Sequence, residues 1–571
     1  MENPQEIQPV SSKIHIANRN LKDLFLKSDI TIKVNHELDR DEANIIALGY
    51  KPELRREFSF WSVFCVSFSV LGLLPSIASC FDYQQLVVGM SPIPWLLAVF
   101  FVTSVALSLA EVASAYPTCM GTSYAVSQLS PPKYAGLLTW LTCCSNWLSQ
   151  ITSAPSVNYS GACMILAVVS FNSNDYSPTN AQIYGLSTAL QFVHAFITSM
   201  PTRWLSIFNQ LSTSSNLVFL AIVFVMIFAG DDRETLYNHS IPKFNSNAKA
   251  WSLDNQTDFP MGIAMLESFL GVIWAMSGYD SPFNLAEECS NADSAAPKAI
   301  VLTSTLGGLV GWFFMLAISY TAVSVEEIAK DPLNLGQPFV TYLTQIMDRK
   351  LVNAATSLTI ISSFFMGGSC MLAASRLAYA YGRDGVLPFS RFTKNVNSIT
   401  QTPVNAVWVN FVIGQLLLLL IFAGDTAIGA IFSVGGIASF INFTLPTFLK
   451  ITYARKTFKK GPWNLGIFST PIGVISIAFV LVMIPILCFP NVTGKDLTLD
   501  EMNWTVVVYF GPMLIWLLWY LVDGRKWYHG ATTNLSDEMF SEEDSYENDA
   551  GPNEKADRQN VNVVDKSVSD V

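Results

Sequence analysis

Two apolar segments of the sequence carry a glycine and a proline near their middle. SFSVLGLLPSIAS (residues 67–79) contains Gly72 and Pro75, and WAMSGYDSPFNLAEE (274–288) contains Gly278 and Pro282. Both residue types interrupt a helix, which frees backbone amides that can hold a carboxylate and carbonyls that can hold a cation. Inside a membrane such groups are tolerated only where they line a cavity or find other partners. The two breaks therefore predict a small-molecule site rather than simple proline kinks. We expect it to be lined by Ser69, Gly72, Leu73, Ser76, Glu267, Trp274, Ser277, Gly278, Tyr279 and Asp280.

Two acidic residues in the second segment have alternative roles. Asp280 can bind the amine of a substrate or cap the half-helix that follows it, and we favour the cap. Glu267 precedes Trp274 by seven residues, about two helical turns, so both side chains share a face. An acid there can bind a cationic substrate or carry a coupling proton, or simply be hydrated near the outer mouth. Trp274 and Tyr279 flank the break and can form a wall for a cation or ordinary core packing.

Charged residues also gather where two apolar segments end. Glu287 and Glu288 follow the second break, and Arg376, Arg383 and Asp384 end the segment at 351–381. Opposite charges at two helix ends predict an ionic gate that biases the protein between inward-facing and outward-facing states.

The elements that must position these residues are membrane helices. Of the 571 residues 51% are apolar and only 13% are charged, about half the charged fraction of a soluble domain. Apolar runs near the ~20 residues that span a bilayer fill the chain from residue 58 to residue 522. We predict an all-α polytopic membrane protein with twelve transmembrane helices: 58–80, 91–116, 135–169, 181–201, 204–229, 260–284, 299–323, 351–381, 403–423, 427–450, 468–489 and 504–522.

The two broken spans occupy matching places in the order of spans. Each opens a group of five, at 58–229 and 260–450, and an odd number of spans gives the second group the opposite orientation. This pattern predicts a five-plus-five inverted repeat with broken helices 1 and 6, followed by helices 11 and 12 at 468–522.

Charge indicates the orientation and the nature of the two ends. Loops on the side of the termini carry 17 lysines and arginines against 7 opposite, which places both termini in the cytosol. Sequons at Asn238, Asn255 and Asn491 fall in loops assigned to the outside and are candidate glycosylation sites. The arm at 1–57 and the acidic tail at 523–571 are expected to be solvated and largely disordered. The net charge of −11 and the lack of a basic stripe exclude nucleic-acid binding.

Several motifs resemble a known family of transporters. GYDSPFNLAEECSNADSAAPKAI (278–300), SRLAYAYGRDGVLPFS (375–390) and AEVASAYPTCMGTSYAVSQLSPPKYAG (110–136) are similar to conserved regions of the amino acid–polyamine–organocation (APC) superfamily. GYKPELRREFS (49–59), FSVLGLLPSIAS (68–79) and KWYHGATTNLSDEMFSEED (526–544) most resemble fungal GABA permeases, in its amino acid/choline transporter branch.

The resemblance spans residues 45–545 and implies the LeuT-like five-plus-five fold, alternating access, and uptake of amino acids or amines, often coupled to protons. It also implies that Glu111 is an acidic residue at the inner gate, expected to pair with a base such as Arg383. Two departures bear on the substrate. Cys119-Met120-Gly121 stands where the family usually has a Gly-Gly pair, and span 1 lacks the Gly-x-Gly that holds the carboxylate of many amino acid substrates.

The sequence leaves three functions open. The first is a proton-coupled permease for GABA-like amino acids, with a small-molecule substrate, a coupling proton and membrane lipid as its partners. The second transports an organic cation such as choline, thiamine or a polyamine, which Glu267 and the missing glycine motif favour. The third is a non-transporting nutrient receptor. We predict no enzymatic activity, no cofactor and no bound metal, since no nucleophile–base pair, metal cluster or phosphate loop is found. The plasma membrane is the expected location and a vacuolar or other internal membrane the alternative.

Overall fold

The structure, a computed structural model, describes residues 40–50, 56–173, 176–230, 232–237, 240–490 and 502–531. The chain divides into two compact units, one made of residues 1–53 and 532–571 and the other of residues 54–531. In the first unit the described segment contains helix α2 (Arg40–Ala47), within what the sequence predicted to be a polar arm. Most of both predicted arms, together with Asn238 and Asn491, lies outside the described residues.

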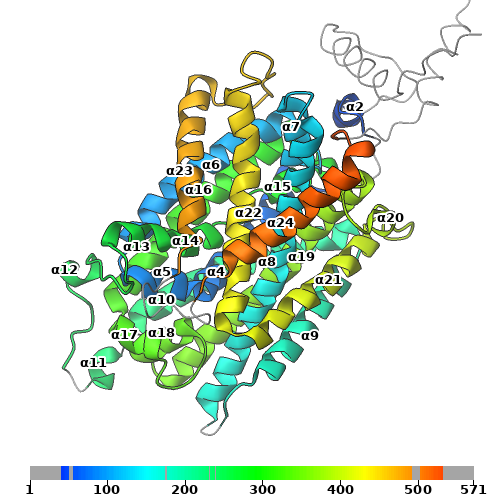
Figure 1. The fold of residues 1–571 in the computed structure, drawn as a ribbon. Helices are drawn as coiled ribbons and strands as arrows, with labels where there is room; N and C mark the ends of the chain where they lie inside the picture. Colours follow the sequence, from blue (N-terminus) through cyan, green and yellow to red (C-terminus); the bar gives the residue numbers. More distant parts are fainter. Residues whose placement is uncertain are drawn as a thin grey trace, which may run out of the picture. The chain divides into compact units, whose positions relative to one another are not determined.

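In the described part of residues 54–531 the regular secondary structure is helical, apart from one isolated bridge between Phe58 and Cys289. Ten helices or helix pairs there are long and apolar enough to cross a membrane (Figure 1). They are α3 (Phe60–Leu71) with α4 (Leu73–Ser79), α6 (Ile93–Ala115), α8 (Ala135–Asn172), α10 (Thr202–Ala229), α16 (Ala292–Thr321), α19 (Arg349–Arg383), α21 (Val404–Leu418) with η2 (Leu419–Ala423), α22 (Asp425–Ile451), η3 (Gly466–Phe468) with α23 (Ser469–Ile486), and α24 (Thr505–Val522).

The remaining two predicted spans fall on helices that are shorter or less apolar. Span 181–201 contains α9 (Asn180–Thr198), and span 260–284 contains α13 (Met261–Glu267), α14 (Phe269–Ala275) and α15 (Ser281–Asn284). Short helices connect the long ones: α5 (Phe81–Val88), α7 (Thr122–Leu129), α11 (Arg233–Leu236), α12 (Asn247–Ala250), η1 (Ala286–Glu288), α17 (Val325–Lys330), α18 (Pro338–Ile346), α20 (Ser390–Thr393) and η5 (Gly524–Lys526).

Local sequence explains where several of these helices begin and end. The Ser59 hydroxyl accepts a hydrogen bond from the Ser62 amide at the start of α3, and the Asp348 carboxylate accepts one from the Leu351 amide at the start of α19. Both are N-caps that satisfy an orphan donor of the first turn. Helix α3 ends at Gly72, whose φ of 44° and ψ of 61° lie in the left-handed region that glycine adopts most readily.

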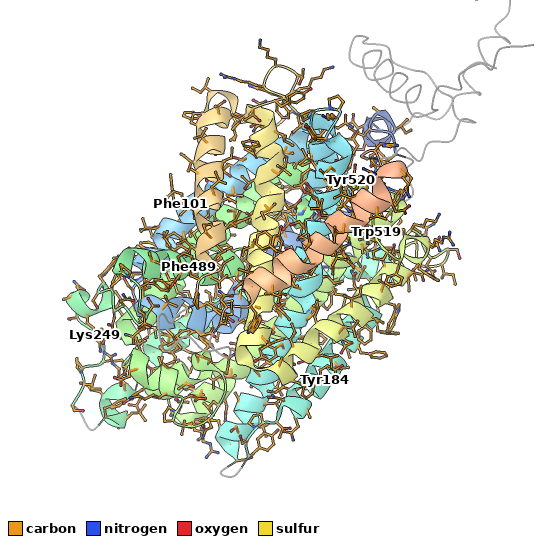
Figure 2. The ribbon with its side chains drawn as sticks, viewed as in Figure 1. Phe101, Tyr184, Lys249, Phe489, Trp519 and Tyr520 are labelled. Atoms are coloured by element: carbon orange, nitrogen blue, oxygen red, sulfur yellow. The ribbon has the colours of Figure 1, made fainter. Side chains whose placement is uncertain are left out.

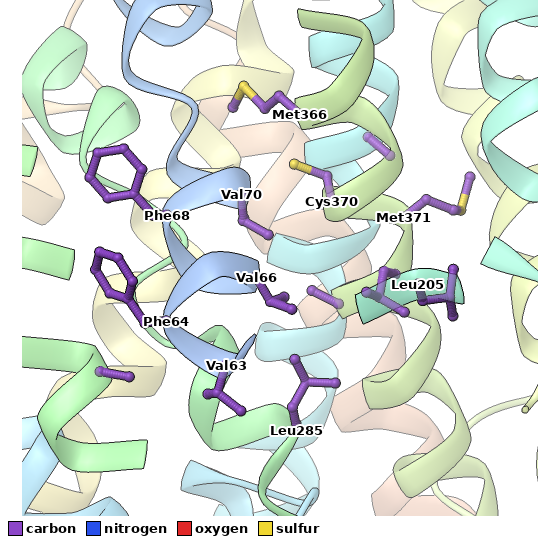
Figure 3. Packing of buried hydrophobic residues seen from close by; sticks show 14 of the residues in the cluster. Val63, Phe64, Val66, Phe68, Val70, Leu205, Leu285, Met366, Cys370 and Met371 are labelled. Atoms are coloured by element: carbon purple, nitrogen blue, oxygen red, sulfur yellow. The ribbon is translucent and has the colours of Figure 1, made fainter. Parts of the chain in front are cut away.

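Close packing of long helices around α3 builds the core. Helix α16 packs along both α6 and α3, and α8 packs along α19 and α22. Glycines of α16 allow the approach: a Cβ on Gly311 would lie 2.1 Å from the Trp95 ring, and the Trp95 indole N–H donates to the Gly308 carbonyl at 2.9 Å. Valine and phenylalanine side chains of α3 lie in one buried cluster with Met366, Cys370 and Met371 of α19 (Figure 3). Helix α3 is therefore enclosed, so that its break at Gly72 lies in the protein interior.

The C-terminal end of the second unit packs on α7 and α8. Trp140 of α8 is fully buried, and Trp519 and Tyr520 of α24 contact its ring with centroid distances of 5.0 and 5.7 Å (Figure 2). Beyond α24, the Tyr528 ring also contacts Trp140, at 5.3 Å, and the Ala531 amide donates to the Ser127 hydroxyl of α7 at 3.0 Å. Residues 524–531, predicted to belong to a disordered tail, are therefore packed, because aromatic residues at their start have a partner in α8.

Candidate substrate site

The two predicted helix breaks lie against each other. Gly278 has a φ of 97°, and a Cβ there would lie 2.5 Å from Cγ1 of Val70, the residue two before Gly72. The Ser67 hydroxyl of α3 donates to the Gly278 carbonyl at 3.2 Å, which gives one freed carbonyl of the second break a partner from the first broken helix. The segment after α15 is also bound to the start of α3, since the Phe58 amide donates to the Glu288 carbonyl at 3.1 Å.

A small cavity of about 40 Å³ lies beside the second break. That volume holds about three water molecules, so the cavity must widen before it can admit a substrate. Five elements line it: α3, the segment from α14 through the break, and the long helices α8, α19 and α22. The lining residues are Val70, Ser149, Gln150, Ser153, Ile273, Trp274, Ser277, Gly278, Tyr279, Asp280, Met366, Cys370, Gly435, Gly436, Ser439, Phe440 and Phe443.

Five of the ten predicted binding residues line this cavity, and five do not. Those that do are Trp274, Ser277, Gly278, Tyr279 and Asp280, all from the second broken span. The five that do not line it are Ser69, Gly72, Leu73, Ser76 and Glu267. The residue of the first broken span that lines the cavity is Val70. A role in substrate binding stays a prediction for all ten.

The first-span residues lie behind the cavity wall in contact with α19. A Cβ on Gly72 would lie 2.6 Å from Sδ of Met366, so this glycine makes room for a lining side chain. The Ser69 hydroxyl is hydrogen-bonded to those of Ser212 and Ser369, and the Ser76 hydroxyl donates to the Leu71 carbonyl at 2.7 Å. Leu73 is fully buried. These residues hold α3 and α4 against their neighbours.

Asp280 is the one charged residue among those that line the cavity. The Gln150 amide donates to its Oδ2 at 2.8 Å, and the Asn284 amide donates to the same oxygen at 3.1 Å. The side chain makes no capping hydrogen bond to α15, so the favoured capping role is not what the structure shows. Both of these side-chain donors meet Oδ2, and neither meets Oδ1.

Glu267 lies at the end of α13 and is buried, with 8% of its surface exposed. Neither carboxylate oxygen has a hydrogen-bond partner among the described residues. The hydrated acid that the sequence left as an alternative is therefore not what the structure places here. Ser268, which joins α13 to α14, has φ −61° and ψ −19°, so the chain stays helical between Glu267 and Trp274.

Three aromatic rings form a layer on one side of the cavity. The Trp274 ring contacts Phe432 of α22 at a centroid distance of 4.8 Å, and Phe432 contacts Tyr83 of α5 at 5.7 Å. Two glycines of α22 make space for this layer. A Cβ on Gly435 would lie 3.2 Å from the Trp274 ring, and one on Gly429 would lie 2.7 Å from the Tyr83 hydroxyl. We call Tyr83, Trp274 and Phe432 the aromatic layer.

The charged residues predicted to form a gate meet in two ion pairs. The Arg383 guanidinium donates to both carboxylate oxygens of Glu287, at 2.9 and 3.0 Å, and Arg376 Nε donates to Glu288 at 2.9 Å. Asp384 Oδ1 lies 3.8 Å from Arg383 Nε. All five side chains are buried or nearly so, and this ionic cluster joins α19 to the segment that follows the second break. Its role as a gate stays a prediction.

We expected Glu111 to pair with Arg383, but the structure gives it a different partner. Lys450 of α22 donates to Glu111 Oε2 at 2.7 Å, and the Ser469 hydroxyl donates to the same oxygen at 2.6 Å. Arg383 is already held by Glu287, and α6 packs beside α22 and α23, which brings Lys450 and Ser469 to Glu111. The expectation failed because the resemblance identified the acid but did not define its neighbours.

Sequence reasoning missed the contributions of α8 and α22 to the cavity. Ser149, Gln150 and Ser153 precede Pro155 within α8, and Gly435 and Gly436 form a pair within α22. A glutamine in an apolar span is a signal that could have been used, because an unsatisfied amide is costly in a membrane. No group of His, Cys, Asp and Glu side chains suited to a metal ion occurs among the described residues.

Comparison with known proteins identifies the family of this chain. The profile described as "Amino acid permease" matches residues 58–512. The chain is 59% identical to a Candida albicans protein named "Putative polyamine transporter", over 95% of this chain and 98% of that one. It is 50% identical to an uncharacterized amino-acid permease of Schizosaccharomyces pombe, over 91% and 96% of the two chains. It is 30% identical to amino-acid permease 2 of Neurospora crassa, over 86% and 88%. The chain therefore belongs to the amino acid permease family of the APC superfamily, a family of multi-pass membrane transporters and not of enzymes.

Proposed function

We propose that this permease imports an organic amine, with a linear polyamine as the first candidate, by proton-coupled alternating access. The observation that carries this proposal is Asp280, an acid in a cavity whose other lining residues are uncharged. A cationic amine at Asp280 Oδ1 would neutralise a charge that is costly to keep in the membrane interior. The name of the Candida albicans relative supports the same substrate class.

The contacts of Asp280 suit it to this role. Gln150 and Asn284 hold Oδ2 and so fix the direction of the carboxylate before a ligand arrives. A hydrogen bond to a charged group contributes about 1.5–3 kcal/mol, which corresponds to a change in affinity of roughly tenfold to a hundredfold. Trp274 and Tyr279, which also line the cavity, offer aromatic faces to the same cation.

In the proposed cycle the aromatic layer acts as the gate on one side of the cavity and the ionic cluster as the gate on the other. The ring contacts within the layer and the ion pairs within the cluster support this assignment. We assign the ionic cluster to the cytosolic side of the membrane. In this arrangement the chain crosses the membrane twelve times, the first ten spans form two inverted repeats of five, and both termini lie in the cytosol. The positive-inside count supports this orientation. Glycosylation of Asn255 is expected in this orientation, and loss of a glycosidase-sensitive mass shift in Asn255→Gln would test the sidedness. The plasma membrane is the location that we propose.

A GABA-like amino acid is the second candidate, because its amine could bind Asp280 while freed backbone at the second break takes its carboxylate. The turn at residues 276–280 between α14 and α15 supplies such backbone. A zwitterion would need both contacts, whereas a polyamine needs only the first.

Uptake by transporter-deficient cells tests the proposal. Labelled spermidine and GABA would be supplied separately to wild type, Asp280→Asn, Asp280→Glu and a control, Asp348→Asn, whose acid caps α19 far along the chain from the cavity. We expect saturable spermidine uptake that rises as external pH falls, is lost at least tenfold in Asp280→Asn, and is retained in the control. Uptake of GABA alone would favour the second candidate. Amine uptake that is unchanged in Asp280→Asn would refute the role of Asp280.

A further inference from the structure

A buried acid lies two helical turns from the cavity without a partner. Both oxygens of Glu267 lack a hydrogen bond, and no cationic side chain among the described residues forms an ion pair with it. Its side chain is more than nine-tenths buried, as the 8% exposure shows. Desolvating an unpaired carboxylate costs several kcal/mol, and a cation bound to Glu267 would offset that cost.

The helical segment from Glu267 to Trp274 defines how far Glu267 lies from the cavity lining. Seven residues of helix separate it from Trp274, which corresponds to about 10.5 Å along the axis. Trp274 lines the cavity, and Asp280 lies six residues further along the chain. An amine held by Glu267 would therefore lie about 10 Å along the helix axis from Trp274, which lines the cavity that contains Asp280.

The aromatic layer lies beside the helical segment that separates Glu267 from the cavity. The Trp274 ring faces Phe432, and Phe432 faces Tyr83, which lies on a helix that packs against both α13 and α14. The Trp274 indole N–H also has no hydrogen-bond partner in the described part of the chain, and only 4% of the residue is exposed. A chain of methylenes and amines suits this arrangement, because aromatic faces attract cations and pack against methylenes.

We propose that Glu267 is a second amine-binding site, which selects linear polyamines whose terminal amines are more than about 10 Å apart. The inference rests on the proposed function, since Asp280 binds the first amine. An extended chain advances roughly 1.25 Å per bond when its bonds are about 1.5 Å long. Spermidine, with nine bonds between its terminal nitrogens, then reaches about 11 Å and spermine, with thirteen, about 16 Å, whereas putrescine, with five, reaches about 6 Å.

The test compares labelled putrescine, spermidine and spermine in cells that express wild type, Glu267→Gln, Glu267→Asp or Glu234→Gln. Glu234 is an exposed acid in the short helix α11, and its variant controls for a general loss of negative charge. Uptake is normalised to the amount of transporter at the cell surface. In Glu267→Gln we expect KM for spermidine and spermine to rise about tenfold or more and KM for putrescine to stay within twofold. Glu267→Asp keeps the charge and should recover most of the selectivity for length.

The outcomes separate this inference from the proposed function. Wild type that transports amines, together with an equal change of KM for all three in Glu267→Gln, would overturn the length-selecting role and leave the role of Asp280 intact. No change for any amine would overturn it as well, and so would an equal effect of Glu234→Gln. Wild type that takes up no amine would overturn the proposed function, and the inference with it.

Discussion

Gly278 allows a direct test of how the two broken helices meet. Its φ of 97° is a conformation that costs a residue with a Cβ about 1–2 kcal/mol. The added Cβ of Gly278→Ala would also lie 2.5 Å from Val70 Cγ1 and 3.2 Å from the Leu71 amide nitrogen. Overpacking of this kind costs about 1–3 kcal/mol, so we expect Gly278→Ala to destabilise the protein by about 2–5 kcal/mol.

Gly262 is a matched control in the same broken span. It lies in α13, and a Cβ there would meet no atom within 4 Å, so Gly262→Ala should be neutral or stabilising by up to about 1 kcal/mol. The assay is the midpoint temperature at which detergent-purified protein stops eluting as a single species after heating, measured beside uptake. The midpoint should fall clearly for Gly278→Ala and not for Gly262→Ala.

A double variant separates the two contributions. Val70→Ala removes the methyl groups that the new Cβ would strike but leaves the cost of the positive φ. In Val70→Ala/Gly278→Ala we therefore expect the two substitutions together to destabilise the protein by about 1–3 kcal/mol less than the sum of their separate effects. The stability lost in Gly278→Ala should be only partly recovered. Equal stability of Gly278→Ala and Gly262→Ala would refute the close approach of the breaks. Additive effects in the double variant would refute the contact with Val70.

Two further predictions concern the buried ion pairs. Lys450→Met leaves the Glu111 carboxylate buried without its charged partner, so we expect the protein to lose about 3–5 kcal/mol of stability, seen as a lower midpoint in the same thermal assay. Glu111→Gln/Lys450→Met should recover most of this stability. A Lys450→Met variant as stable as wild type would contradict the prediction. Arg383→Met removes the bidentate partner of Glu287, which also accepts from the Cys119 amide. Cys119 is fully buried in the wild type, and in Arg383→Met we expect it to react faster with a thiol reagent. Labelling that is lost in a Cys119→Ala background would identify Cys119 as the reacting residue. Unchanged labelling in Arg383→Met would argue against the ionic cluster as a gate.

The elements of the fold were predictable from local pattern. Apolar runs near the length of a bilayer crossing predicted the helices, and the glycine in each broken span marks the place where the backbone leaves the helix. Gly72 and Gly278 could be recognised from the sequence because positive φ depends on the residue itself. Helix α9 matched its predicted span although it is less apolar than the others, since capping by Thr179 and Gln182 marks its start.

The candidate site was only half predictable. Its residues from the second break follow from a motif contiguous in sequence, whereas Gln150 and Gly435 reach the cavity because α8 and α22 pack against each other. The expected pairing of Glu111 with Arg383 failed for the same reason. Glu111 and Lys450 are 339 positions apart, and nothing in either local sequence specifies that they meet.

By itself the sequence determined the helical membrane class, the two breaks and the family motifs, because hydrophobic length, helix breakers and short motifs act through neighbours along the chain. The tertiary structure alone decided which oxygen of Asp280 accepts from Gln150 and Asn284, and which base neutralises Glu111. It also decided that Glu267 is buried with no hydrogen-bond partner among the described residues. These outcomes depend on the packing of helices that are distant in sequence, and that packing decides which polar groups are desolvated together.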